Sequence, residues 1–378
     1  MSDKKMIAND IKVKNRQLIY QFIRAQGSVS KQDIVFGLQL SLPTVTQNLQ
    51  YLKAQGLIDD SQKIKNTGGR NATAYTYIQD AKAAIGIYIS AHHMNGVAVD
   101  LSGNEMLTVR KRIKFDLDDD EYLRQLGRIV EEIKERANIA DENLLGVGIG
   151  VPGLVSEDGE EVLYGLTLNF TGKTRTEIAK YIPYRNRLFH DSYVAGYAEV
   201  WGSDHLEDVF YISLSNSIGG SVVMNGEIYE GSSHKGGEIG HMIIEPNNGK
   251  TCYCGGKGCF DTVCNAGVLD QYTDGNLERF FQLLEQQDET AVKLWDEYLD
   301  YLAVAVVNIR VLFDSVIILG GYVGAYIDSY MEELYRRVDA RFPFDESARE
   351  YLIPCRYKVE AAAAGAAISY IEEFFGAI

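Results

Sequence analysis

The feature that most restricts the fold of this chain is a stretch rich in Gly, Cys and His at positions 236–261, GGEIGHMIIEPNNGKTCYCGGKGCFD. Four of its side chains, His241, Cys252, Cys254 and Cys259, are of the types that hold tetrahedral Zn²⁺, because thiolate sulfur and imidazole nitrogen suit this borderline-soft cation. Since four protein ligands leave no open coordination position, we expect a structural zinc ion that fixes the loop around it. A disulfide is the alternative, although Cys252 and Cys254 are too close in sequence to bridge each other comfortably.

The composition is that of a soluble globular protein. Of the 378 residues, 46% are hydrophobic and 24% are charged, and the length allows two or three domains. No apolar run approaches the roughly 18 residues of a membrane span, and the polar start MSDKKMIANDIK does not resemble a signal peptide. We therefore expect a cytoplasmic protein, a location that disfavours disulfides. The two remaining cysteines, Cys264 and Cys355, are expected in the core.

Charge is distributed unevenly along the chain. Residues 1–80 carry 11 Lys or Arg against 6 Asp or Glu, whereas residues 81–378 carry 26 against 47. This asymmetry predicts a small anion-binding module attached to a large acidic body, and the body alone should repel nucleic acid.

Residues 1–80 have the pattern of a winged helix-turn-helix DNA-binding domain. Apolar residues at helical spacing predict a first helix over 9–26. Ser30 and Ser41 are favourable N-caps for two short helices around a tight turn, the second of which runs over 44–55. In such a motif the second helix enters the major groove. A helical docking module with no DNA role is the alternative.

Two predicted strands, around 64–65 and 75–77, follow the second helix and are joined by the turn 67–70, as in a wing. The expected DNA contacts divide into base-reading side chains on the second helix and phosphate-binding side chains around it, with one Arg for a minor groove. The base-reading set is Thr44, Gln47 and Gln50, the phosphate-binding set is Lys31, Ser41, Thr46 and Lys65, and the minor-groove residue is Arg70. One module makes few contacts, so a specific site requires a dimer.

From residue 84 the pattern changes to alternating strands and helices, which is typical of an α/β domain. Three strands precede an amphipathic helix over 121–137, and an apolar strand, LLGVGIGVPG, follows it. After the Cys-rich stretch the chain is mainly helical, with a buried strand VIILGG at 316–321 and an Ala-rich last helix.

These residues together resemble the ROK family of bacterial sugar kinases and sugar-responsive repressors. The resemblance rests on Gly-Glu-x-Gly-His at 237–241 followed by Cys-x-Cys-Gly-x-x-Gly-Cys-x-acid at 252–261, on the GVGIGVPG and VIILGG segments, and on a helix-turn-helix with a Gly-Gly-Arg wing. It implies a two-lobed α/β actin-like ATPase (ribonuclease H-like) fold over 81–378, with sugar bound between the lobes. Lobe one would comprise about 81–195 plus the C-terminal helix, and lobe two about 196–357.

The resemblance also implies sugar-binding residues. Glu238 and His241 match the family's sugar-contacting Glu and His, and Asp191 matches its general base. His190 stands where the kinases have an Asn, Asp261 replaces a Glu, and Asn169 lies in the expected pocket loop. The predicted sugar-binding set is therefore Asn169, His190, Asp191, Glu238, His241 and Asp261.

Two departures from the family affect the predicted activity. Family kinases hold ATP phosphates with two Gly-rich turns, through backbone N–H groups that only small residues leave accessible. Here the first turn has bulky Tyr88 and Ile89, and the second is Ser215-Asn216-Ser217. Because phosphoryl transfer depends on positioning and charge stabilisation, we expect kinase activity to be lost, with Asp191 a vestigial base and no catalytic residue.

The sequence therefore predicts a sugar-responsive DNA-binding transcriptional regulator, most consistent with a homodimeric or tetrameric repressor of carbohydrate-utilisation genes such as those of xylose metabolism. The first alternative is a ROK kinase that phosphorylates a hexose or amino sugar with ATP. The second is a DNA-bound scaffold that responds to a protein partner.

Overall fold

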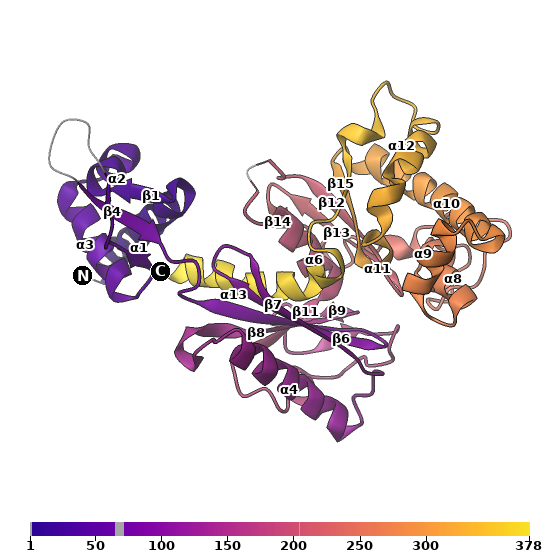
Figure 1. Cartoon of the computed structure of the whole chain (residues 1–378), viewed down its shortest axis with the longest axis horizontal. Coiled ribbons are helices and arrows are strands. Elements are labelled where there is room, and N and C mark those ends of the chain that lie inside the picture. The colour runs from indigo at the N-terminus through magenta and orange to yellow at the C-terminus, as the bar shows by residue number, and fades with distance from the viewer. Residues whose placement is uncertain (1, 65–71, 204) are drawn as a thin grey trace.

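The computed structural model describes residues 2–64, 72–203 and 205–378, and it divides into an N-terminal winged helix-turn-helix and a two-lobed α/β body (Figure 1). The N-terminal region contains three helices and four short strands, of which β4 pairs antiparallel with β1, β2 and β3. Its elements are α1 (Ser2–Gln26), β1 (Ser28–Ser30), α2 (Lys31–Leu38), α3 (Leu42–Ala54), β2 (Ile58–Asp59), β3 (Lys63–Ile64) and β4 (Ala72–Tyr77).

The helix-turn-helix forms where the sequence predicted it. Ser30 caps α2 in a capping box with Asp33, and Ser41 caps α3 by accepting a hydrogen bond from the Thr44 backbone N–H. Between the two helices, Gln39 adopts a left-handed conformation with φ of 53°, which turns the chain sharply. The first helix begins at Ser2 and so is longer than the predicted 9–26. The predicted wing strands β3 and β4 pair, whereas the predicted contacts Lys65 and Arg70 lie outside the described residues.

Lobe one contains a five-stranded sheet of order β11-β8-β5-β6-β7, in which β5, β8 and β11 are parallel and β5, β6 and β7 are antiparallel. The alternating apolar residues of these strands pack against α4 on one face and α13 on the other. Its elements are β5 (Ala83–Ile89), β6 (His93–Asp100), β7 (Glu105–Arg112), α4 (Asp120–Arg136), β8 (Leu144–Val151), β9 (Leu154–Val155), β10 (Val162–Tyr164), α5 (Arg175–Ile178) and β11 (Asn186–His190).

Lobe two contains a second five-stranded sheet, of order β14-β13-β12-β15-β16, with helices α8, α9, α10 and α12 on its outer side. The hairpin between β13 and β14 turns at Asn225 and Gly226, both with positive φ, as expected for an Asn-Gly turn. Its elements are β12 (Val209–Leu214), β13 (Ile218–Met224), β14 (Glu227–Ile228), α7 (Asp261–Cys264), α8 (Gly267–Asp270), α9 (Leu277–Glu285), α10 (Glu289–Phe313), β15 (Val316–Gly320), α11 (Gly321–Gly324), α12 (Met331–Asp339) and β16 (Leu352–Pro354). Cys264 and Cys355 are buried, as predicted.

Two helices connect the parts of the molecule. Helix α6 (Asp191–Val200) leaves the end of β11 and packs on β12 and β13 of lobe two, and the last helix, α13 (Ala361–Ala377), packs on β5, β8 and α6. Small side chains permit this close packing, since an added Cβ at Gly86 or Gly365 would lie 1.7 or 1.8 Å from the facing backbone. The end of α13 reaches the N-terminal region, where the Gln17 side chain donates to the Gly376 carbonyl.

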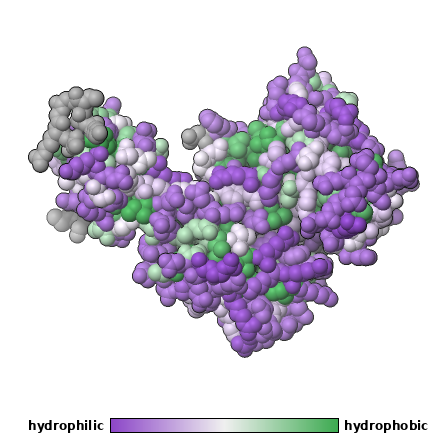
Figure 2. All heavy atoms as spheres, viewed as in Figure 1, coloured by the Kyte–Doolittle hydropathy of each residue, from purple (hydrophilic) through white to green (hydrophobic). Residues whose placement is uncertain are grey.

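The face shown in Figure 2 is largely hydrophilic, and a narrow neck joins the N-terminal region to the body. No helix in the described part of the chain is both long enough and apolar enough to cross a bilayer.

Candidate functional site

A cleft between the lobes brings together most of the polar residues that the sequence singled out. Strand β11 ends at His190 and α6 begins at Asp191, so both side chains lie at the lobe-one wall, whereas Glu238 and His241 come from a loop of lobe two. The cavity between them measures about 50 Å³, room for roughly four water molecules.

Asp191 is held in a protein interior that disfavours its charge. Burial raises its pKa to about 7, against hydrogen bonds from the Ser192 backbone N–H and the Tyr88 hydroxyl that favour the ionised form. Glu238 faces it across the cleft, and burial raises the pKa of Glu238 as well. Two carboxyl groups that face one cavity suit a ligand with several hydroxyl groups, because a carboxyl group accepts hydrogen bonds and, when protonated, also donates one.

His190 shares the wall with Asp191 and is neutral at physiological pH, because burial lowers its pKa to about 4. Its Nε2 lies 3.1 Å from the Ser192 hydroxyl and 3.9 Å from Glu238. Its other ring nitrogen, Nδ1, is buried without a hydrogen-bond partner in the described part of the chain. The ring packs edge-on against Tyr193, with centroids 4.3 Å apart.

The predicted zinc ligands converge beside this cleft. The donor atoms of His241, Cys252, Cys254 and Cys259 all lie within 4.8 Å of one another, and this is the only such group found in residues 2–64, 72–203 and 205–378. The Cys254 and Cys259 sulfurs are 3.8 Å apart, as are the Cys252 sulfur and His241 Nδ1. Zn–S bonds of about 2.3 Å at a tetrahedral angle place two sulfurs about 3.8 Å apart, so the donor set fits Zn²⁺.

The loop backbone explains why glycines accompany the ligands. Gly258 has φ of 73°, and a Cβ there would lie 2.0 Å from the Glu245 carbonyl oxygen. Only glycine allows that approach, which turns Cys259 toward the other donors. Because His241 also lines the cleft, the metal centre fixes one wall of the candidate ligand site.

Two predicted sugar contacts do not lie on the cavity wall. Asp261 is buried and its carboxylate accepts a hydrogen bond of 2.6 Å from the Ile218 backbone N–H, so it supports a residue that lines the cleft. Asn169 is exposed at a left-handed position of its loop, two residues beyond Thr167, which does line the cleft. Direct sugar contact by Asp261 and Asn169 therefore stays a prediction, and the hydrogen bond of Asp261 positions Ile218 at the cleft.

The structure also adds a cleft residue that the sequence did not indicate. Tyr253 lies between two zinc ligands in the chain, its ring is 5.3 Å from the His241 ring, and it lines the cleft together with Thr167 of lobe one. Its position between Cys252 and Cys254 was the available signal, since metal ligation fixes the direction of the residue between them.

The side of the cleft beyond Asp191 is filled by aromatic side chains. Tyr88 of β5, Tyr211 of β12 and Tyr322 of α11 are buried there and leave about 20 Å³. Tyr88 contacts Asp191 directly, and the Tyr322 backbone N–H donates to the Ser215 hydroxyl. Of the two bulky residues that the sequence indicated, Tyr88 therefore occupies the interior beside the candidate base.

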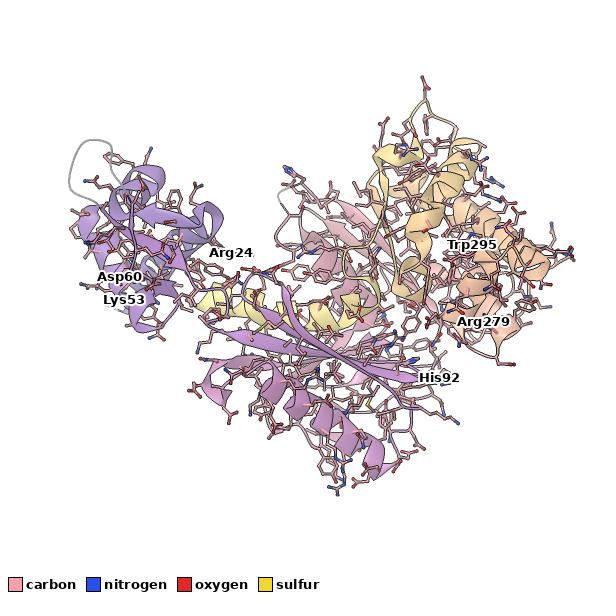
Figure 3. The ribbon with its side chains drawn as sticks, in the orientation of Figure 1. Arg24, Lys53, Asp60, His92, Arg279 and Trp295 are labelled. Atoms are coloured by element: carbon pink, nitrogen blue, oxygen red, sulfur yellow. The ribbon has the colours of Figure 1, made fainter. Side chains whose placement is uncertain are left out.

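On α3 the expected DNA-reading residues are not equivalent. Gln47 and Gln50 are exposed on one face, and Lys31 is half-buried at the start of α2. The Ser41 and Thr44 hydroxyls hydrogen-bond each other at 2.8 Å, and the Thr46 hydroxyl donates to the Leu42 carbonyl. The hydroxyls of Ser41, Thr44 and Thr46 therefore already make hydrogen bonds within α3 and its N-cap. The exposed glutamines are more accessible to DNA. Figure 3 shows the neighbouring Lys53 and Asp60, which form an ion pair of 2.8 Å.

Comparison with known proteins gives one consistent result. A family model described as the ROK family matches residues 84–373. A xylose repressor of Bacillus subtilis (strain 168) is 23% identical over 265 residues, 68% of this chain and 67% of that protein. A solved ROK family transcriptional regulator, a homolog of the E. coli MLC protein, has a TM-score of 0.72 at 23% identity and covers 97% of both chains. A ROK family glucokinase from Streptomyces griseus, in complex with glucose and AMPPNP, has a TM-score of 0.64 at 19% identity over 76% of this chain and 98% of its own.

Proposed function

The chain belongs to the ROK family, and from this premise we propose that it is a sugar-responsive DNA-binding transcriptional regulator, a repressor of carbohydrate-utilisation genes that a small sugar releases from its operator. In this proposal residues 1–80 bind DNA and residues 81–378 bind the effector. The protein acts in the cytoplasm as a dimer or tetramer.

The observation that carries the proposal is the helix-turn-helix itself, which precedes the ROK body and packs on the last helix of that body. A helix-turn-helix that exposes Gln47 and Gln50 has side chains able to pair bidentately with adenine in the major groove. The excess of positive charge in residues 1–80 supports contact with phosphates, whereas the acidic body stays away from DNA.

Sugar binding would act on the lobes because the cleft takes its polar groups from both. A sugar that bridges Asp191 and His190 of lobe one to Glu238 and His241 of lobe two favours the closed arrangement. A ligand shifts a conformational equilibrium only by its difference in affinity for the two states. A typical coupling of about 1–3 kcal/mol lowers operator affinity by about 5- to 150-fold.

In the same proposal Zn²⁺ is structural. It is held by His241, Cys252, Cys254 and Cys259, it fills its coordination sphere with protein ligands, and it supplies no reaction chemistry. Its contribution to function is to orient the imidazole of His241 toward the cleft.

The deciding experiment measures operator affinity and sugar response on one full-length preparation. DNA fragments recovered by selection from a random pool are titrated by fluorescence anisotropy, with xylose tested first and then other pentoses, hexoses and amino sugars. We expect nanomolar binding that one sugar weakens by about fivefold or more. Sugar binding that leaves operator affinity unchanged would contradict the inducer role, and would favour a regulator that responds to a protein partner.

A ROK sugar kinase is the second candidate, because Asp191 is retained in the cleft. Against it, Tyr88, Tyr211 and Tyr322 occupy the space beyond this carboxyl, and phosphoryl transfer requires phosphates and metal to be positioned there. We expect no sugar-dependent ADP release in a coupled assay with ATP and Mg²⁺. Turnover above that of an Asp191→Asn control would establish the kinase instead.

A further inference from the structure

A second and much larger cavity lies directly beside the cleft, along helix α6. Its volume is about 530 Å³, against about 50 Å³ for the cleft, and the two cavities share Leu154 and His190 as a common wall. We name this cavity the α6 groove. It is lined by Phe189, Tyr193, Tyr197, Glu230, His234 and Glu372.

The α6 groove has the chemistry of a saccharide site. Its lining combines the aromatic side chains of Phe189, Tyr193 and Tyr197 with the carboxylates of Glu230 and Glu372. Small-molecule sites are commonly apolar surfaces with a few placed polar groups, and a sugar ring offers both a C–H face and hydroxyl donors. An anionic ligand is disfavoured, because the carboxylates of the lining outnumber its one Arg.

Several polar groups of the groove are already held in place. The Tyr193 hydroxyl donates to the His234 and Gly236 carbonyls at 3.2 and 2.9 Å, and His234 Nδ1 lies 2.5 Å from the Glu230 carboxylate. The groove wall therefore does not depend on a ligand for its order, and ordered groups bind with little loss of entropy.

His190 is the link between the two cavities. Its side chain is 9% exposed, its Nε2 side meets the cleft carboxylates, and its Nδ1 has no hydrogen-bond partner in the described part of the chain. An unpaired buried nitrogen costs free energy.

We propose that the effector is a disaccharide or longer saccharide, with one ring in the cleft and the next ring in the α6 groove. This inference rests on the proposed function and names its ligand class. The small cleft has no room for a second ring, so the rest of a longer saccharide requires the adjoining space. A monosaccharide then binds more weakly, since it leaves the aromatic faces of the groove unused.

The test compares matched sugars by isothermal titration of the full-length protein. The pairs are xylose with xylobiose, glucose with cellobiose, and N-acetylglucosamine with chitobiose. For the sugar that the cleft accepts, we expect the disaccharide to bind about tenfold tighter or more than its monosaccharide, equivalent to about 1.4 kcal/mol. The variants Tyr197→Ala and Glu230→Gln should lose this gain while monosaccharide affinity stays within about twofold. Tyr229→Ala, on the same loop but exposed and outside the lining, is the matched control.

Each other outcome is decisive. A monosaccharide that binds as tightly as its disaccharide overturns the two-ring inference and leaves the proposed function intact. Failure of every sugar to bind contradicts both. Binding of the diamine putrescine, sensitive to Glu230→Gln and without a disaccharide gain, would identify the groove as an amine site and overturn the inference.

Discussion

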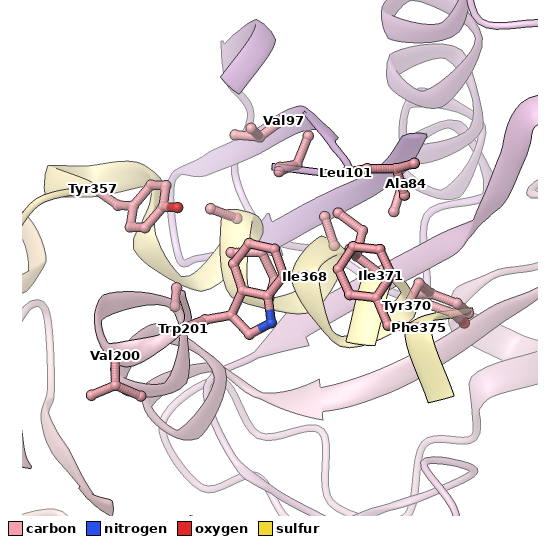
Figure 4. Packing of buried hydrophobic residues seen from close by; sticks show 14 of the residues in the cluster. Ala84, Val97, Leu101, Val200, Trp201, Tyr357, Ile368, Tyr370, Ile371 and Phe375 are labelled. Atoms are coloured by element: carbon pink, nitrogen blue, oxygen red, sulfur yellow. The ribbon is translucent and has the colours of Figure 1, made fainter. Parts of the chain in front are cut away.

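Trp201, the residue that ends helix α6, stacks on Phe375 of helix α13 with ring centroids 6.2 Å apart and an interplanar angle of 9° (Figure 4). Its indole N–H donates to Glu372, and the Arg24 guanidinium of α1 lies 4.8 Å from the Trp201 ring centroid. Tyr20 of α1 packs edge-on against Phe375 as well. Helix α6 therefore begins at the cleft and ends, about 15 Å later, at the contact with the N-terminal region.

We predict that Trp201→Ala uncouples sugar binding from DNA binding. Helix α6 connects Asp191 to the contact with α1, so removal of its terminal ring deletes the stacking on Phe375 and the contact with Arg24 through which lobe closure would move the DNA-binding region. We expect the sugar-induced loss of operator affinity to fall below about twofold while sugar affinity changes little. Arg24→Ala should have a smaller effect, since a cation–π contact contributes about 0.5–1 kcal/mol at an exposed site.

The matched control is Arg124→Ala. Arg124 lies 4.4 Å from the Tyr181 ring centroid on the outer face of lobe one, far along the chain from the neck. It should leave the sugar response unchanged. A full sugar response in Trp201→Ala would show that the signal takes another route.

We predict that Asp191 makes the folded protein less stable as pH rises. Its pKa is about 7 in the folded state against an ordinary value of 3.8, so the folded state keeps a proton that the unfolded chain has released between about pH 4 and pH 7. The unfolded state binds fewer protons, and the free energy of unfolding falls as pH rises through this window. Asp191→Asn removes the contribution. In thermal melts, the melting temperature of the variant minus that of the native protein should increase by about 2 °C or more from pH 5 to pH 8.

The pH dependence caused by Asp191 can be separated from that of the neighbouring titratable groups. His190 lies beside Asp191, but its pKa is lowered, so it destabilises the folded protein only as pH falls below its ordinary pKa. The pKa of Glu238 is raised by burial, and this contribution is shared by the native protein and the Asp191→Asn variant. The exposed Asp345→Asn should show no pH-dependent difference from the native protein. A pH-independent offset for Asp191→Asn would mean that Asp191 is ionised in the folded state at pH 5.

The zinc centre predicts a contrast between two buried cysteines. Cys252→Ser removes a ligand, so purified protein should contain much less than one zinc per chain, melt about 5 °C lower or more, and lose sugar affinity because His241 is no longer fixed. Cys264→Ser changes a cysteine whose sulfur contacts the Tyr298 carbonyl instead. It should retain one zinc. Equal zinc content in the two variants, by elemental analysis, would contradict the ligand set.

The parts of this structure that were predictable from sequence are those set by local interactions. The zinc ligands lie close together in the chain, and the helix-turn-helix follows from caps such as Ser30 with Asp33, three residues apart. The sequence also indicated that Tyr88 is incompatible with a phosphate-binding turn, because such a turn tolerates only small residues at that point.

The remaining parts depend on distant residues. The Asp261 carboxylate is held by the backbone N–H of Ile218, 43 residues earlier in the chain. The contact of Trp201 with Phe375 joins residues far apart in sequence, and the α6 groove exists only where β11, α6 and α13 meet. No local pattern indicates such contacts, since each residue separately reads as an ordinary core position.

Gln47 and Lys31 are expected to make different kinds of contact with DNA. Gln47 is exposed on α3, so Gln47→Ala should weaken binding to the selected operator by about 5- to 150-fold and relax the base preference at one position, as expected for one bidentate contact of about 1–3 kcal/mol. Lys31→Ala should instead weaken all sequences alike and reduce the slope of log affinity against log salt by about 1. Lys53→Ala is the control, because Lys53 is paired with Asp60. Anisotropy titrations at several salt concentrations distinguish the three, and a uniform loss for Gln47→Ala would assign base recognition to other residues.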